Sequence, residues 1–195
     1  STIDTYLTYR LTGNKNFVTE PSNASRTLLM DLDTCEWDDE LLSFLEIPKR
    51  VLPKIQDSFS NFGETKDLGF LPDGIPITCI LGDQQAALFG QGGHDKGALK
   101  CTYGTGAFIL LNTGDTKTYS SNGLLTTVAY QHKGKKVYAL EGAAYIAGAA
   151  VQWLSALGVQ PENVLNTFHH VQLWIHDNGF MAEYAPVFLE CASIT

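Results

Sequence analysis

The amino-acid sequence predicts an α/β fold, and three stretches of the chain lead to this prediction. In the first, the apolar run of residues 77–81 ends at Gly82 and is followed by a helical pattern rich in small residues. In the second, residues 99–112 alternate between apolar and polar side chains around a glycine-rich turn. In the third, residues 142–154 have the periodicity of a helix with many small side chains. Strands that alternate with helices are typical of α/β proteins.

The composition limits the kind of protein. With 195 residues, the chain can form one large domain or parts of two, and 44% hydrophobic and 17% charged residues are ordinary for a globular protein. The net charge of −8 and the lack of a Lys/Arg cluster that could neutralise phosphates along a duplex argue against a nucleic-acid partner. No apolar segment approaches the roughly 20 residues that span a bilayer. Because the chain begins with Ser1 inside a helical pattern, we expect it to be a piece of a longer protein.

The N-terminal part of the chain predicts short elements. Residues 2–12 form a helical pattern that Gly13-Asn14 would end, and we expect its apolar face to be packed. Residues 17–19 and 26–30 resemble strands, with a turn-rich stretch at 21–23 between them. The helix face that we expect to be packed consists of Ile3, Tyr6, Leu7, Arg10 and Leu11.

A second helix is predicted at residues 37–45. Glu36, Asp38, Asp39 and Glu40 surround its first turn, where acidic side chains complement the helix dipole, so these charges need no metal ion to explain them. Residues 48–74 are rich in Pro and Gly and predict mostly loop, with a short strand at 62–65.

The cysteines argue against a zinc or redox motif, because they lie far apart in the sequence and form no C-x-x-C pair. Two of them, Cys79 and Cys101, fall in strand-like runs, so we expect buried, reduced thiols and a cytosolic location. The four cysteines are Cys35, Cys79, Cys101 and Cys191.

The run at 77–81 predicts a buried strand, and Gly82 would let the backbone turn there. Asp83 and Gln84 would then stand at the carboxyl end of the strand, where α/β sheets bind ligands. An alternative is that Asp83 only caps the following helix, and for an isolated Gly-Asp pair that is the commoner case.

Two hairpins are predicted after a shift in composition near Gly90, which is the best candidate for a domain boundary. Strands at 99–103 and 108–112 are joined by a glycine tip, and strands at 124–130 and 136–140 are joined by a turn at 133–135.

The tip Gly104-Thr105-Gly106 carries little side-chain bulk, so its N–H groups and the Thr105 hydroxyl could approach phosphate oxygens. The alternative is an ordinary tight turn. The chain contains no Walker A motif and no G-x-G-x-x-G motif.

In this order, the strand, Gly-Asp-Gln, helix, glycine-tipped hairpin and small-residue helix resemble the sugar kinase family related to actin and hexokinase, and within it the glycerol kinases. The resemblance extends from residue 1 to about residue 170. It rests on TIDTY at 2–6, SNASRT at 22–27, WDDELL at 37–42, GDQQAAL at 82–88, TYGTG at 102–106, LLNTG at 110–114, GLLTT at 123–127 and ALEG at 139–142.

The resemblance implies phosphorylation of glycerol by MgATP between two ribonuclease-H-like domains that close over the substrates. Residues 1–90 would end the N-terminal, substrate-binding domain, and residues 91–195 would begin the C-terminal, nucleotide-binding domain. Mg²⁺ would neutralise the transferring phosphoryl group, and its carboxylate ligand is expected outside this chain, so no metal ligand is assigned here.

The resemblance also implies a role for individual side chains. Asp83 would be the general base, and Gln84 would hydrogen-bond a glycerol hydroxyl. Phe108 would pack against the glycerol carbons, although a core position in a strand explains it equally well. The residues implied to contact the nucleotide are Gly104 and Thr105, at its phosphates, and Gly148 and Gln152, on one face of a helix.

Three features depart from the family pattern or fall outside it. Bacterial relatives inhibited by fructose 1,6-bisphosphate carry an arginine-containing loop before the central strand, whereas residues 71–76 contain no arginine here, so we expect no such inhibition. The sequence after residue 178 diverges from the family. The cluster His169, His170 and His176 predicts a surface helix rather than a metal site.

Three interpretations of function stay open. Besides a glycerol kinase, the chain could belong to a kinase for another polyol or sugar, such as xylulose or gluconate. It could also be a non-catalytic remnant that acts as a binding module, and we expect it to be inactive alone. A homo-oligomer is possible.

Overall fold

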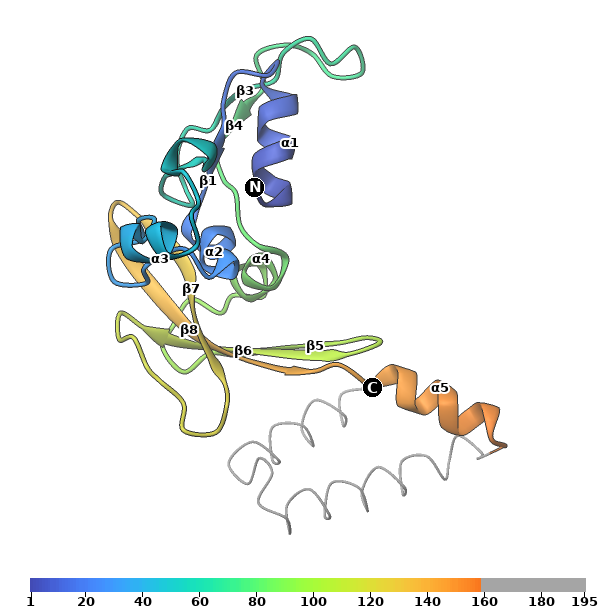
Figure 1. Cartoon of the computed structure of the whole chain (residues 1–195). Coiled ribbons are helices and arrows are strands. Elements are labelled where there is room, and N and C mark those ends of the chain that lie inside the picture. The colour runs from blue at the N-terminus through green and yellow to red at the C-terminus, as the bar shows by residue number, and fades with distance from the viewer. Residues whose placement is uncertain (159–195) are drawn as a thin grey trace. The chain divides into compact units, whose positions relative to one another are not determined.

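The computed structural model describes residues 1–158 (Figure 1). The chain divides into two compact units. Unit 1 contains Ser1–Lys100, Leu110–Ser120 and Leu124–Glu141, and unit 2 contains Cys101–Ile109, Ser121–Gly123 and, within the described chain, residues 142–158. The predictions for the divergent tail, for the three C-terminal histidines and for Cys191 lie outside the described residues. No helix in the described part of the chain is both long and apolar enough to cross a membrane.

The N-terminal elements of unit 1 follow the prediction in part. Helix α1 (Ile3–Leu11) leads to strand β1 (Val18–Thr19), which pairs in parallel with β2 (Lys54–Ile55). Helix α3 (Asp39–Phe44) begins after Asp38, whose carboxylate accepts the N–H groups of Glu40 and Leu41. These three predicted elements are confirmed, and a short 3₁₀ turn, η2 (Lys49–Val51), follows α3.

Residues 21–30 differ from the prediction. The expected turn forms a short helix, α2 (Pro21–Ala24), because the Glu20 carboxylate accepts two N–H groups of its first turn. The expected strand at 26–30 is wrong. A 3₁₀ turn, η1 (Ser25–Thr27), takes its place, and Leu28 follows in the left-handed region at φ 62°, which no strand allows.

The prediction for the packed face of α1 is also wrong. The side chains of Ile3 and Tyr6 are 69% and 56% exposed, whereas Asp4, Thr5 and Thr8 are buried. The buried face is polar because the Asp4 carboxylate accepts a hydrogen bond from the Thr19 hydroxyl at 2.7 Å. A hydrogen bond to β1 therefore decides which side of the helix faces inward.

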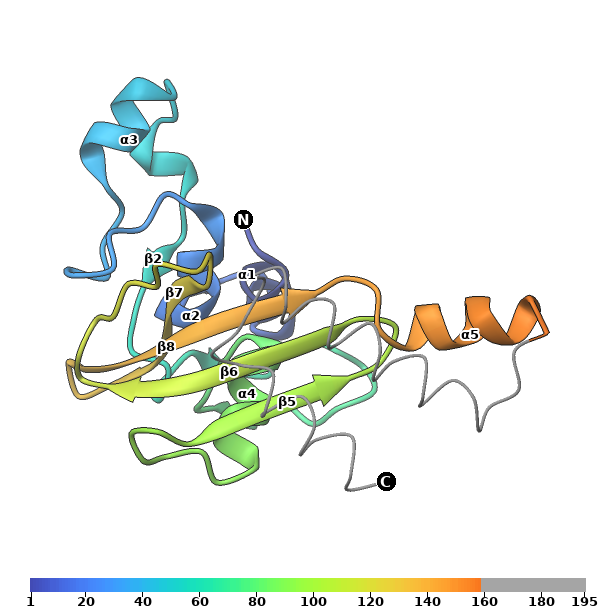
Figure 2. The ribbon, with the colours of Figure 1, turned by 90° about the horizontal axis from the view of Figure 1, so that it is seen from below.

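The main sheet has four strands in the order β5-β6-β8-β7 (Figure 2). Both predicted hairpins are confirmed. At the turn between β7 and β8, Lys133 and Gly134 have φ values of 50° and 72°, as the favoured two-residue hairpin turn requires. The strands are β5 (Leu99–Tyr103), β6 (Ala107–Gly114), β7 (Leu125–His132) and β8 (Lys135–Ala144).

Unit 1 has two hydrophobic clusters, and the β7–β8 hairpin contributes to both. Val128 and Tyr138 belong to the first cluster, with Trp37 and Leu42. Their chain neighbours Ala129 and Ala139 belong to the second, with Leu88 of α4 (Asp83–Gly90) and Leu110. Successive residues of a strand point to opposite faces, so one hairpin joins the N-terminal segments on one side to α4 on the other.

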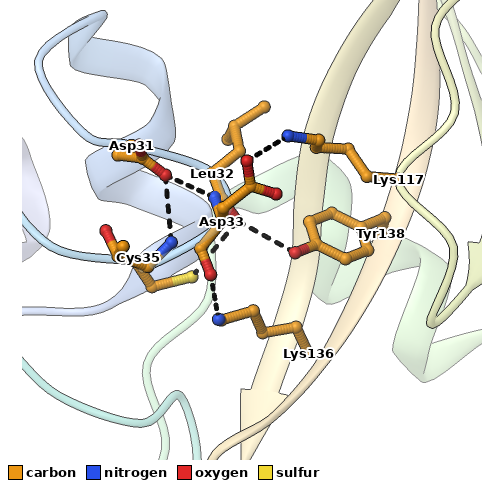
Figure 3. Close-up of polar contacts among 8 residues, drawn as sticks. Asp31, Leu32, Asp33, Cys35, Lys117, Lys136 and Tyr138 are labelled. Carbon is orange, nitrogen blue, oxygen red and sulfur yellow. Dashed lines mark hydrogen bonds and ion pairs between the residues drawn. The ribbon is translucent and has the colours of Figure 1, made fainter.

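Polar contacts fix the loop of residues 31–35 to β8 and to Lys117, which lies in the connection between β6 and β7 (Figure 3). Asp31 accepts the N–H groups of Asp33 and Thr34, and these bonds lower its pKa. Tyr138 donates to the Leu32 carbonyl at 2.9 Å, Lys117 pairs with the Asp33 carboxylate, and Lys136 donates to the Asp33 carbonyl.

Cys35 ends this loop as a buried thiol (Figure 3), and burial raises its pKa to about 11. The thiolate is therefore disfavoured, and Cys35 has the properties of a structural cysteine. The expected burial of the other two described cysteines is wrong, because Cys79 is exposed and Cys101 is half-buried.

Candidate active site

Asp83 is the first residue of α4 and is exposed to solvent. Gly82 occupies the N-cap position and provides no side-chain cap. The Asp83 carboxylate accepts the N–H of Gln84, the next residue, at 2.7 Å. Asp83 is therefore not the capping residue, and most of its carboxylate surface is open to a ligand.

The segment that precedes this junction is not the buried strand that was predicted. Only Pro76–Ile77 forms a strand, β4, which pairs antiparallel with β3 (Gly63–Glu64), and Thr78 and Cys79 are exposed. A strand is buried when strands on both sides and layers on both faces cover it, and residues 78–81 have no strand beside them within the described chain. The end of the apolar run correctly indicated the start of α4, but residues 78–81 of the run neither form a strand nor are buried.

Gln84 is held by Lys100, a contact that the sequence did not reveal. Lys100 is 2% exposed, and its Nζ donates to the Oε1 atom of Gln84. An ammonium group can only donate, so this contact fixes the orientation of the amide and leaves the NH₂ group of Gln84 as its donor to other molecules. A lysine within an alternating strand was the available signal, but the sequence contains no information on its burial.

The predicted phosphate contacts lie in unit 2, at the tip between β5 and β6. The Gly104 carbonyl accepts the N–H of Gly148 at 2.9 Å, and the Thr105 carbonyl accepts those of Ala147 and Ala149 at 2.8 and 3.3 Å. Three carbonyl-to-amide contacts therefore join the tip to the start of α5 (Gly148–Ala156).

The same contacts determine where the tip amides point. In a trans peptide the N–H is opposite the C=O of the same unit, so the N–H groups of Thr105 and Gly106 point away from α5. Among the described residues, no hydrogen bond uses these two N–H groups or the Thr105 hydroxyl. Successive free amides with an adjacent hydroxyl suit an anion, whereas the first amides of α5 are already bonded to the tip.

Glycine is required where the tip packs against the end of β8 and the start of α5. A Cβ atom on Gly148 would lie 2.5 Å from the Gly104 oxygen, and one on Gly106 would lie 2.7 Å from the Ala144 oxygen. Neither glycine has a positive φ, so close approach of the backbones, rather than backbone conformation, accounts for them. The tip is thus a packed element and not only a tight turn.

The remaining predicted residues of unit 2 have simpler surroundings. The helix expected at 142–154 begins later, at Gly148, because residues 142–144 extend β8. Gly148 and Gln152 are four residues apart in α5, and Gln152 is exposed. Phe108 is half-buried in β6, and its ring edge lies 3.4 Å from the position of a Cβ on Gly106.

The structure thus contains two candidate partial sites, one in each unit. Asp83, Gln84 and Lys100 belong to unit 1, and the tip with the amides of Thr105 and Gly106 belongs to unit 2. Residues 1–158 contain no group of three His, Cys, Asp or Glu side chains that could hold a metal ion, so no Mg²⁺ ligand is assigned to them.

Comparison with known proteins identifies the family. Residues 1–90 match the N-terminal domain, and residues 99–175 the C-terminal domain, of the FGGY family of carbohydrate kinases. The chain is 56% identical over 155 residues to the glycerol kinase of Myxococcus xanthus, a match that covers 78% of this chain and 31% of that protein.

Solved structures show the same relationship. The crystal structure of Plasmodium falciparum glycerol kinase with ADP has a TM-score of 0.76 and 43% identity, over 84% of this chain and 33% of that one. A gluconate kinase from Lactobacillus acidophilus has a TM-score of 0.68 and 26% identity, over 78% of this chain and 30% of that one.

These likenesses confirm the predicted fold class, the ribonuclease-H-like α/β fold of actin-like sugar kinases. The chain spans about a third of the length of the relatives it matches. With both domain types of one family matched in order along its length, this chain belongs to the FGGY family of carbohydrate kinases.

Proposed function

We propose that the full-length protein to which this chain belongs transfers the γ-phosphoryl group of ATP to glycerol, giving sn-glycerol 3-phosphate and ADP. The observation that carries the proposal is the exposed carboxylate of Asp83, adjacent to the oriented amide of Gln84 at the start of α4. The higher identity to glycerol kinases, 56% and 43%, than to the gluconate kinase, 26%, supports glycerol over a sugar acid.

In the proposed reaction, unit 1 holds the acceptor. The Asp83 carboxylate takes the proton of the terminal hydroxyl as that oxygen attacks the γ-phosphorus and ADP leaves. The NH₂ group of Gln84 donates to another hydroxyl of glycerol. The family resemblance assigns Phe108 to the carbon atoms of glycerol, where its ring would keep water from the reacting phosphorus.

Unit 2 holds the nucleotide in this proposal. The N–H groups of Thr105 and Gly106 and the Thr105 hydroxyl bind phosphate oxygens of ATP, and Gly104 supplies backbone close to them. Gly148 and Gln152 face the nucleotide from α5. Mg²⁺ bound to ATP would supply charge neutralisation at the phosphates, with its protein ligand outside residues 1–158.

We also propose a domain boundary near Gly90, with residues 1–90 on the acceptor side and 91–195 on the nucleotide side. The two family domains matched at 1–90 and 99–175 support this division, whereas the compact units divide the chain differently, because residues 91–100, 110–120 and 124–141 pack with the N-terminal segments. A cytosolic location is proposed from the free thiols of Cys35, Cys79 and Cys101.

A substrate panel tests the proposal. The full-length protein is assayed with MgATP and glycerol, xylulose or gluconate, and ADP release is measured. We expect the highest kcat/KM with glycerol. A higher kcat/KM with xylulose or gluconate would assign the protein to another kinase of the family. Lack of phosphorylation of all three would favour a non-catalytic binding module. The 195-residue chain alone is expected to be inactive.

A further inference from the structure

We infer that Glu20 and Ser22 are positioning residues for Asp83. A buried carboxylate and a serine hydroxyl hold the N–H of Gly82 and thereby orient the Asp83 side chain. The inference rests on the proposed function, because Asp83 is the general base there. Neither Glu20 nor Ser22 is placed in contact with a substrate.

Glu20 has a fully buried carboxylate, and its polar contacts are all with hydrogen-bond donors. Its side chain is 0% exposed and accepts five hydrogen bonds. No cation pairs with it among the described residues. A buried charge is costly unless hydrogen bonds replace its hydration, so this carboxylate is stable only while all its partners keep their places. The donors are the backbone N–H of Ser22, the Ser22 hydroxyl, the N–H and the side-chain amide of Asn23, and the Ser58 hydroxyl.

Ser22 connects this carboxylate to the junction before α4. The Ser22 hydroxyl donates its one proton to Glu20 Oε1 at 2.5 Å, so its lone pairs are left to accept, and the N–H of Gly82 donates to it at 2.8 Å. Ser22 and Gly82 are 60 residues apart in the sequence. The carboxylate therefore determines the direction of the serine hydroxyl, and the hydroxyl fixes the Leu81–Gly82 peptide, one unit before the peptide that joins Gly82 to Asp83.

A second partner of Glu20 holds the segment just upstream. The Ser58 hydroxyl donates to Glu20 Oε2 at 2.6 Å, and the Ser58 carbonyl accepts the N–H of Ile80 at 3.0 Å. The N–H of Gln131, in β7, donates to the Ser58 hydroxyl at 3.1 Å. One buried carboxylate thus restrains the chain at both Ile80 and Gly82, in a segment that has no strand beside it.

The contact at Gly82 is not required to form the helix. The first helical hydrogen bond of α4 uses the Gly82 carbonyl, which accepts the N–H of Ala86 at 2.7 Å, and the N–H of Gly82 lies outside the helical pattern. The bond from Gly82 to Ser22 therefore adds orientation rather than helix stability. Loss of this bond should therefore change the orientation of Asp83 without unfolding α4, whereas loss of a purely structural contact would destabilise the helix.

Two alanine variants of Glu20 partners provide the test in the full-length protein. Ser22→Ala and Asn23→Ala each remove one side-chain hydrogen bond to Glu20, but only Ser22→Ala also removes the acceptor of the Gly82 N–H. We expect Ser22→Ala to lower kcat for glycerol by about 10- to 100-fold with little change in KM for ATP. Asn23→Ala should stay within about threefold of the wild-type kcat.

Amide hydrogen exchange gives a readout independent of activity. The Gly82 amide should exchange faster in Ser22→Ala than in Asn23→Ala at similar melting temperatures. Glu20→Gln places an amide NH₂ among donors, and we expect it to accelerate exchange at both Gly82 and Ile80. If Glu20→Gln fails to fold, the comparison of Ser22→Ala with Asn23→Ala still tests the inference.

Equal losses of kcat in Ser22→Ala and Asn23→Ala, or unchanged Gly82 exchange in Ser22→Ala, would overturn the inference. If the wild-type protein phosphorylates no glycerol, the proposed function fails, whereas the exchange data still show whether Ser22 holds the junction.

Discussion

The two partial sites are held in different ways. The junction before Asp83 depends on side chains from distant parts of the sequence, since Ser22 binds the Gly82 N–H and Lys100 binds the Gln84 amide. The tip of unit 2 depends on backbone contacts to α5, which glycines make possible. The first site is therefore sensitive to loss of a polar atom, and the second to gain of a carbon atom. The predictions below test this contrast.

The largest effect is expected for Asp83→Asn, which removes the proposed base without changing its shape. We expect kcat for glycerol phosphorylation by the full-length protein to fall by about 10²- to 10⁴-fold. Asp39→Asn is the matched control, because Asp39 is the exposed first residue of α3 as Asp83 is of α4, and its ion pair with Lys49 joins two exposed side chains and adds little stability. Both changes weaken the interaction with a helix dipole, so similar melting temperatures are expected. Wild-type activity in Asp83→Asn would remove this residue as the base.

Gly148→Ala tests the backbone contact of unit 2. The added Cβ would lie 2.5 Å from the Gly104 oxygen, and we expect a destabilisation of about 1–3 kcal/mol, with a higher KM for ATP. The sign of the stability change is informative, because Gly-to-Ala changes in helices otherwise stabilise a protein by about 1 kcal/mol. Gly90→Ala, at the end of α4 with nothing within 4 Å, is the control. Thermal unfolding and ATP titration of the initial rate measure both effects, and a stabilised Gly148→Ala would contradict the packed tip.

Lys100→Met tests the orientation of the Gln84 amide. Without the ammonium group the amide can rotate, and we expect kcat/KM for glycerol to fall by about tenfold. The fold should survive, because Met has a similar shape and removes a buried charge. Lys135→Met, at an exposed position of β8, is the control for loss of a lysine. Equal kcat/KM values in the two variants would show that Lys100 does not orient Gln84.

The smallest effect, none, is expected from fructose 1,6-bisphosphate. The loop before the junction contains no arginine at 71–76 and contributes Asp73, whose pKa is lowered by its hydrogen bond with Lys66. This ionised acid disfavours a phosphate ligand. The activity of the full-length protein should be unchanged at low millimolar concentrations of this compound, and inhibition there would show that a phosphate does bind.

Elements with strong local signals could be predicted from the sequence. The turn at Lys133-Gly134 defined the β7–β8 hairpin, and the acidic first turn defined α3. The segment at 26–30 was mispredicted because β-branched and apolar residues favour a strand only where a partner strand is available. Leu28 instead turns the chain in the left-handed region.

For the candidate site, glycines beside polar residues drew attention to Asp83 and to the tip at Thr105, and the family resemblance implied their roles and that of Gln84. It did not indicate Glu20, Ser22 or Lys100. Their importance depends on contacts across 60 residues for Ser22 and Gly82 and across 16 residues for Lys100 and Gln84, which no local pattern contains.

The sequence by itself determined the fold class, the two hairpins and the order of the functional motifs, because these depend on side-chain periodicity and on turn residues. The tertiary structure decided which face of α1 is buried, that residues 78–81 form no strand, and which polar groups hold Asp83 and Gln84 in place. Periodicity tells which residues share a face, whereas burial and hydrogen bonding depend on the distant segment that covers that face.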